Sequence, residues 1–349
     1  MEKYCPSCET EIQKKSKQWK KQIYCSTKCR KVAHRKKLSK RSREEQKRAN
    51  MLQNDEVLYL VRQCRRAGTV QILSGHDSKS FIETMALIRN RPEANMHLCH
   101  IAPVSGQNSV GLLHAKNLFW GGAYQNQRLG NKALGKGLSI KRNKLLEQWK
   151  VSKELPTNEI LIKIEDYLGE IVKDYINESP IRKSKKAQIA KKIIQLKPEN
   201  NFESLMQLSH TKLLEKWLKL NSVTRPRHSP QKNESKYIFY IDEITRFISY
   251  NSNNNRDLRR LRKALIFGYI ALERLGHSKT YNKDFKSKYG DLAKKFKHAK
   301  LRNDADWSEF KDLIYDTSFR TLQGERLDIK KIYKEIKEYL IFSKSPPFA

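Results

Sequence analysis

Four of the six cysteines stand in two close pairs near the start of the chain. Two residues separate Cys5 from Cys8, three separate Cys25 from Cys29, and sixteen lie between the pairs. Each pair can place two sulfurs on one ion at about 2.3 Å, as in a tetrahedral structural zinc site. Paired cysteines in a long chain of a reducing compartment favour metal over disulfides. The pattern predicts a structural Zn²⁺ that supplies much of the folding energy of about 30 residues.

The second cysteine pair resembles that of small treble-clef zinc fingers. Residues 24–30 read YCSTKCR, which is similar to the pattern Y-C-S-x-x-C-R and implies a helix that opens at the last cysteine. Residues 1–50 hold seventeen Lys and Arg against five Glu. We expect the basic helix to lie along a phosphate backbone, and a solvated helix face is the alternative. The residues expected to contact nucleic acid there are Arg30, Arg35, Lys36 and Lys37.

The charge of the whole chain indicates a polyanionic partner. The 349 residues include 72 Lys and Arg against 37 Asp and Glu, which gives a formal net charge of +35. Nucleic acid, most simply DNA, is the partner that such a charge attracts. A membrane surface is the competitor, but the chain has no run of about 18 apolar residues. The first residues form no apolar signal region, so a cytoplasmic location is expected.

Residues 96–132 hold the side chains best suited to chemistry. Their pattern predicts a strand, a loop, a second strand and a helix, with His100, Asn117 and Asn126 turned toward one point. An imidazole titrates near neutral pH and can activate water, and a carboxamide oxygen is a ligand that Mg²⁺ accepts. Arg128 and Lys132 add donors for phosphate.

This stretch resembles the HNH or His-Me finger (ββα-metal) nucleases. The resemblance rests on CHIAP at residues 99–103, on Asn117-Leu118, on Asn126 nine residues after Asn117, and on GNK at residues 130–132. It implies an endonuclease in which His100 is the general base, Asn117 orients its ring and Asn126 binds the catalytic ion. Such nucleases serve phages, mobile elements and antiphage defence.

One position departs from the family pattern. Cys99 stands where the family usually has Asp or His, and a thiolate suits a soft ion better than Mg²⁺. Either Asn126, water and phosphate hold Mg²⁺ or another divalent ion, or His97 or Cys99 joins with a softer ion. An inactive finger that still binds nucleic acid is the alternative to an enzyme.

The expected fold is α+β and mostly helical. Residues 55–67 and a segment capped by Asp77 are predicted helices, and residues 70–73 a short strand. The predicted domains are a four-cysteine zinc finger with its basic helix (1–50), a ββα-metal finger (51–150), a helical region (151–220), an exposed linker (221–236) and an all-helical domain (237–349). The last domain is a candidate partner-binding or homo-oligomerisation module, and the residues do not distinguish DNA from RNA or duplex from single strands.

Overall fold

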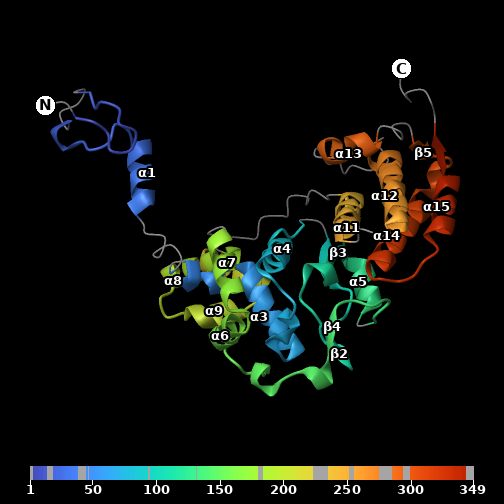
Figure 1. Ribbon diagram of the computed structural model, residues 1–349, viewed down its shortest axis with the longest axis horizontal. Coiled ribbons are helices and arrows are strands. Elements are labelled where there is room, and N and C mark those ends of the chain that lie inside the picture. Colours follow the sequence, from blue (N-terminus) through green and yellow to red (C-terminus); the bar gives the residue numbers. More distant parts are fainter. Residues whose placement is uncertain are drawn as a thin grey trace.

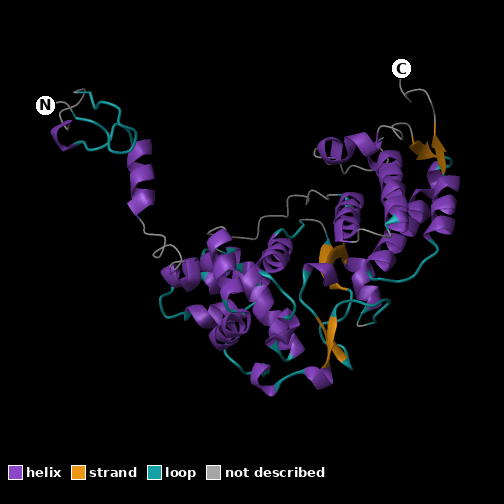
Figure 2. Cartoon of the chain, viewed as in Figure 1, coloured by secondary structure: helices purple, strands orange, loops and turns teal. Residues whose placement is uncertain are grey.

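The computed structural model (Figure 1) describes residues 3–13, 19–37, 45, 47–92, 95–130, 132–179, 184–222, 235–250, 255–274, 285–293 and 299–342. The described residues are mostly helical, with three small antiparallel sheets of two strands each (Figure 2). No described helix is long and apolar enough to cross a membrane. The predicted α+β, mostly helical class is therefore confirmed in its coarse form.

The N-terminal segment folds around its cysteines. An isolated bridge joins Tyr4 to Glu11, and a 3₁₀ turn, η1 (Trp19–Lys21), precedes helix α1 (Thr27–Lys37). Among the side chains described there, Cys5 and Ile12 are the only buried apolar ones. So small a core cannot hold about 30 residues by hydrophobic burial alone.

The central region has one hydrophobic core, built mainly by helices α3 (Asp55–Ala67), α4 (Ser78–Arg89), α6 (Thr157–Leu168) and α7 (Glu170–Glu178). Gly68 ends α3 in the left-handed conformation, and Asp77 begins α4 with a reciprocal capping box. The predicted helix 55–67 and the cap at Asp77 are confirmed. Since α6 and α7 share this core, residue 150 is no boundary between hydrophobic cores.

The strands lie beside this core. Strand β1 (Met96–His100) pairs antiparallel with β3 (Leu118–Gly122), and β2 (Ser109–Gly111) pairs with β4 (Ser139–Lys141). Helix α5 (Ala123–Leu129) follows β3 directly and contacts both β1 and β3. Three-residue 3₁₀ turns complete the region: η2 (Met51–Gln53), η4 (Ala115–Asn117), η5 (Arg142–Lys144) and η6 (Glu147–Trp149).

Helices α8 (Lys185–Leu196), α9 (Phe202–Gln207) and α10 (His210–Leu220) pack into a small separate cluster. Most of the predicted linker lies outside the described residues, and Lys236 already begins the next helix.

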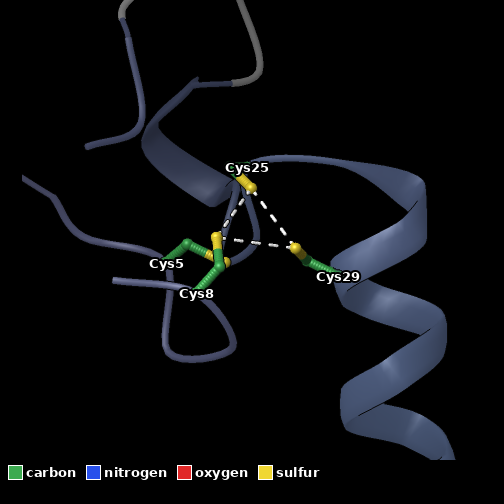
Figure 3. A group of neighbouring side chains, drawn as sticks. All are labelled: Cys5, Cys8, Cys25 and Cys29. Atoms are coloured by element: carbon green, nitrogen blue, oxygen red, sulfur yellow. Dashed lines mark hydrogen bonds between the residues drawn. The ribbon is translucent and has the colours of Figure 1, made fainter. Parts of the chain in front are cut away.

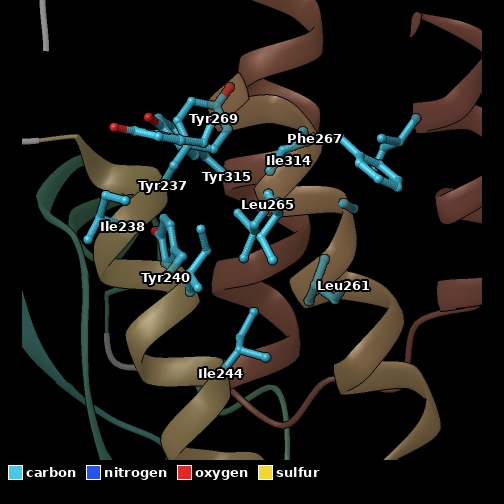
Figure 4. Packing of buried hydrophobic residues seen from close by; sticks show 14 of the residues in the cluster. Tyr237, Ile238, Tyr240, Ile244, Leu261, Leu265, Phe267, Tyr269, Ile314 and Tyr315 are labelled. Carbon is cyan, nitrogen blue, oxygen red and sulfur yellow. The ribbon is translucent and has the colours of Figure 1, made fainter. Parts of the chain in front are cut away.

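The C-terminal core is rich in aromatic side chains (Figure 4). It is built by α11 (Lys236–Tyr250), α12 (Arg256–Gly268), the π-helical turn η7 (Tyr269–Arg274), α13 (Phe285–Ala293), η9 (Asp304–Asp306), α14 (Trp307–Leu322) and α15 (Ile329–Glu338). Strands β5 (Ala299–Leu301) and β6 (Leu340–Phe342) form a further antiparallel pair. The prediction of an all-helical C-terminal domain is therefore wrong in this detail.

The β1–β3 pair lies between the two large cores, as Figure 1 shows. Leu98 and Leu118 pack on the central core built by α3, α4, α6 and α7, which we call the α3 core. Cys99 and Phe119 belong to the C-terminal core. Successive strand residues point to opposite faces, so each core covers one face of the pair.

The predicted strand at residues 70–73 is instead a 3₁₀ turn, η3 (Val70–Leu73). The hydroxyl of Thr69 accepts a hydrogen bond from the backbone N–H of Gln71, which starts a turn rather than an extended strand. Three of the four residues are apolar, and so short a run fits either a strand or a helical turn.

Candidate metal site and candidate active site

The four N-terminal cysteines converge on one point (Figure 3). The Sγ atoms of Cys8, Cys25 and Cys29 lie 3.4 to 3.6 Å apart, and all four sulfurs lie within 4.8 Å of one another. Zn–S bonds of about 2.3 Å in a tetrahedron place neighbouring sulfurs about 3.8 Å apart. The predicted ligands Cys5, Cys8, Cys25 and Cys29 thus form a group that could hold a zinc ion.

Local backbone structure presents these sulfurs. After Cys8 the chain turns through Glu9, whose φ is positive and whose N–H donates to the carbonyl of Cys5. The hydroxyl of Ser26 accepts from the N–H of Cys29 in the first turn of α1. Hydrogen bonding between Cys8 and Thr10 is the largest cause that lowers the pKa of Cys8 to about 6. A thiol that ionises this readily is a good ligand for a cation.

The basic residues expected beside this site are described only in part. Arg30 is exposed on α1, where no ion pair of its side chain is recorded within the described residues. The side chains of Arg35, Lys36 and Lys37 lie outside the described part of the structure, although the helix backbone continues through them.

The predicted strand–loop–strand–helix order is present as β1, β3 and α5, but its side chains face two ways. His97 and Cys99 point to the C-terminal core, and the adjacent Leu98 points to the α3 core. His100 is on the same face as Leu98 by alternation. Asn126 lies on the other face, with its side-chain amide 3.2 Å from Nδ1 of His97. The structure therefore does not bring His100 and Asn126 together.

His100 ends β1 with a partly buried imidazole ring. Its Nε2 is enclosed without a hydrogen-bond partner. Burial, assisted by the positive charge of Arg66, lowers the pKa of His100 to about 4. The ring is consequently neutral at pH 7 and carries a free lone pair.

Asn117 is fully buried and holds the chain just beyond His100. Its Oδ1 accepts from the N–H of Ala102 at 3.0 Å, and its Nδ2 donates to the carbonyls of Ala102 and Leu112. Its own carbonyl accepts from the N–H of Ile101. Asn117 therefore fixes the backbone that follows His100, whereas the prediction was that it orients the ring itself.

The side chains near Asn126 do not fit a resident Mg²⁺. Cys99 is buried, its thiol donates to the carbonyl of His97, and burial raises its pKa above the ordinary value. Magnesium prefers carboxylate oxygens and water in an octahedron. Within the described residues, the N-terminal cysteines are the one group of three or more His, Cys, Asp or Glu side chains that could hold a metal.

The two predicted phosphate ligands on and after α5 differ in their partners. Arg128 forms an ion pair of 2.8 Å with Asp316 on α14, and Gln125 donates to the same carboxylate. Arg128 thereby ties α5 to the C-terminal helices. Lys132 is exposed.

Two features of the site were not predicted. Residues 94–146 contain no Asp or Glu but seven Lys and Arg, a signal that was present in the sequence. Arg246 on α11 donates to the carbonyls of Ala115 and Leu118, on both sides of Asn117. The spacing of residues in the sequence does not predict a contact between residues about 130 positions apart.

No known protein family, curated protein or solved structure matches this chain.

Proposed function

We propose that this protein is an endonuclease that hydrolyses phosphodiester bonds in nucleic acid, with DNA as the expected substrate. The observation that carries the proposal is the state of His100. A neutral imidazole whose Nε2 has no hydrogen-bond partner stands at the end of β1, and Asn117 fixes the chain beside it. It lies in a stretch of 53 residues, 94–146, without a single carboxylate side chain to repel phosphate.

In this proposal the imidazole of His100 takes a proton from a water molecule and afterwards releases it to solvent. The hydroxide attacks phosphorus, the bond to the leaving oxygen breaks, and that oxygen takes a proton from solvent. The N-terminal four-cysteine group and its basic helix would hold the substrate through phosphate contacts that are independent of base sequence. The side chains around Asn126 do not fit Mg²⁺, so the proposed hydrolysis depends on the residues of the chain itself.

A protein that binds nucleic acid without cutting it is the second candidate. The placement of His100 and Asn126 on opposite faces of β1 favours this candidate, because the resemblance implies a single centre that contains both. A role as a regulator or as a component of a nucleoprotein complex would then follow from the same positive charge.

Plasmid nicking distinguishes the two candidates. His100→Ala should abolish nicking and leave DNA affinity unchanged, since one neutral ring is removed. His97→Ala is the matched control on the same strand and should retain nicking. Cleavage by the purified His100→Ala protein would overturn the assignment, and wild-type protein that binds DNA but never cuts it would establish the second candidate. Parallel reactions with Mg²⁺, with Mn²⁺ and without added metal test the cofactor directly.

A further inference from the structure

A group of arginines lies on the same side of β1 as His100. Tyr59, Arg62 and Arg66 follow one another at spacings of three and four residues on α3, so they share one face of that helix. Arg91 stands just after the end of α4. Arg62, Arg66 and Arg91 are exposed, and Tyr59 is partly buried. We refer to these four residues as the α3 arginine face.

The α3 arginine face has no neutralising carboxylate. Neighbouring arginines are engaged elsewhere, since Arg89 pairs with Glu56 and Arg65 donates to the carbonyl of Leu155. Within the described residues, no Asp or Glu oxygen lies within 4 Å of a guanidinium nitrogen of Arg62, Arg66 or Arg91. Arg66 donates to the side-chain oxygen of Gln63 at 3.2 Å, but none of the three arginines has a carboxylate partner within the described residues. Guanidinium groups of this kind are suited to phosphate, whose oxygens accept two parallel hydrogen bonds.

Tyr59 connects this face to β1. The guanidinium of Arg62 lies 5.4 Å from the centre of the Tyr59 ring, which holds it near the helix surface. Tyr59 and Leu98 pack against the same core, and Leu98 shares its face of β1 with His100. Burial is the main cause that raises the pKa of Tyr59 to about 12, and the charges of Arg62, Arg66 and Arg91 oppose that rise.

Arg66 also lies close enough to influence the candidate base. The charge of Arg66 contributes, after burial, to the lowered pKa of His100. Because the imidazole is neutral, it does not form an ion pair with the arginine, and the positive charge remains free to attract a phosphate toward the ring. The opposite face of β1, with His97 and Asn126, is instead covered by α5 and the C-terminal core.

We propose that Arg62, Arg66 and Arg91 bind the phosphodiester backbone of a nucleic acid and place one phosphate beside His100. Tyr59 supports Arg62 through the contact of its ring with the guanidinium. This inference rests on the proposed function in taking nucleic acid as the ligand, and it assigns the substrate to the α3 side of the β1–β3 pair.

The test measures binding of a fluorescently labelled DNA duplex by anisotropy over a series of salt concentrations. Each phosphate that the protein neutralises contributes about −0.9 to the slope of log K, the binding constant, against log salt concentration. The variant Arg62→Gln/Arg66→Gln/Arg91→Gln should therefore have a slope that is less steep by about 2 to 3. The control, Lys330→Gln/Lys331→Gln/Lys334→Gln, removes equal charge from exposed positions on α15. Its slope should be less steep than that of the wild type by less than about 1.

The outcomes separate this inference from the proposed function. An unchanged slope in the arginine variant, or an equal fall in the lysine control, would overturn the inference even if the wild-type protein cuts DNA. A fall confined to the arginine variant would support it even if no preparation cuts DNA, in which case only the endonuclease proposal fails. His100→Ala with intact arginines should keep the wild-type slope.

Discussion

Arg246 joins the C-terminal helices to the β1–β3 pair through a buried ion pair. Its guanidinium donates to Glu243 on the same helix, to the hydroxyl of Tyr250, and to the carbonyls of Ala115 and Leu118 at 2.7 and 2.6 Å. The side chains of Arg246 and Glu243 are 18% and 7% exposed, so water cannot replace these partners.

Arg246→Met keeps an unbranched apolar stem and removes the charged guanidinium group. Breaking a buried pair by removing one partner costs about 3 to 5 kcal/mol, because a charge is left uncompensated. The two carbonyls also lose a donor, but losses within one network do not add. We therefore expect the free energy of unfolding to fall by about 3 to 5 kcal/mol at pH 8.

The loss should depend on pH. Burial raises the pKa of Glu243 above its ordinary value of 4.5, and Arg246 opposes this rise. Without Arg246 the pKa rises further, so the folded variant binds a proton more tightly than the unfolded chain. Stability then falls as pH rises, which means that the variant regains stability as pH is lowered from 8 toward 5.

Urea denaturation followed by tryptophan fluorescence at pH 8 and pH 5 measures both effects. Arg326→Met, at an exposed position, is the control and should change the free energy of unfolding by less than about 0.5 kcal/mol. Glu243→Gln/Arg246→Met should recover part of the loss, because no buried charge remains. A loss below about 1 kcal/mol at pH 8, or an equal loss at both pH values, would refute this account of the ion pair.

Three further predictions concern the candidate sites. Cys29→Ser should release the bound zinc, as measured by a chromogenic chelator, and should leave the melting of the two large cores unchanged; full retention of zinc would contradict the four-cysteine site. Cleavage should be independent of pH between 6 and 8, because a base with a pKa of about 4 is already deprotonated there, whereas an inflection near 6.5 would indicate an unburied imidazole. Gly137→Ala should lower the melting temperature clearly more than Lys136→Ala, since a Cβ would stand 2.2 Å from Oδ1 of Asn117; equal melting would show that this loop can move aside.

Local signals in the sequence predicted the elements that local chemistry determines. The bounds of α3 followed from its apolar spacing and from Gly68, and the start of α4 followed from the cap at Asp77. The cysteine spacing likewise identified the sulfurs that meet. Each of these depends on residues close together in the chain.

The candidate active site was predicted less well, for two different reasons. The alternation of β1 places His97 and Cys99 on one face and His100 on the other. Once the strand is known, the separation of His100 from Asn126, which contacts His97, can be inferred. The sequence could not show that residues beyond 235 cover one face of the pair, because this depends on packing between segments more than 100 residues apart. Arg246 belongs to this second kind.

The β1–β3 pair is covered on one face by the α3 core and on the other by the C-terminal core, and this limits which fragments of the chain can fold alone. A fragment that ends at residue 222 would expose Cys99, Ile101 and Phe119, which the C-terminal core now shields from water. A fragment that begins at residue 235 would lose the apolar side chains against which Tyr240 and Phe319 pack. The two halves therefore depend on each other to keep these apolar side chains buried, and either half studied in isolation would expose them to water.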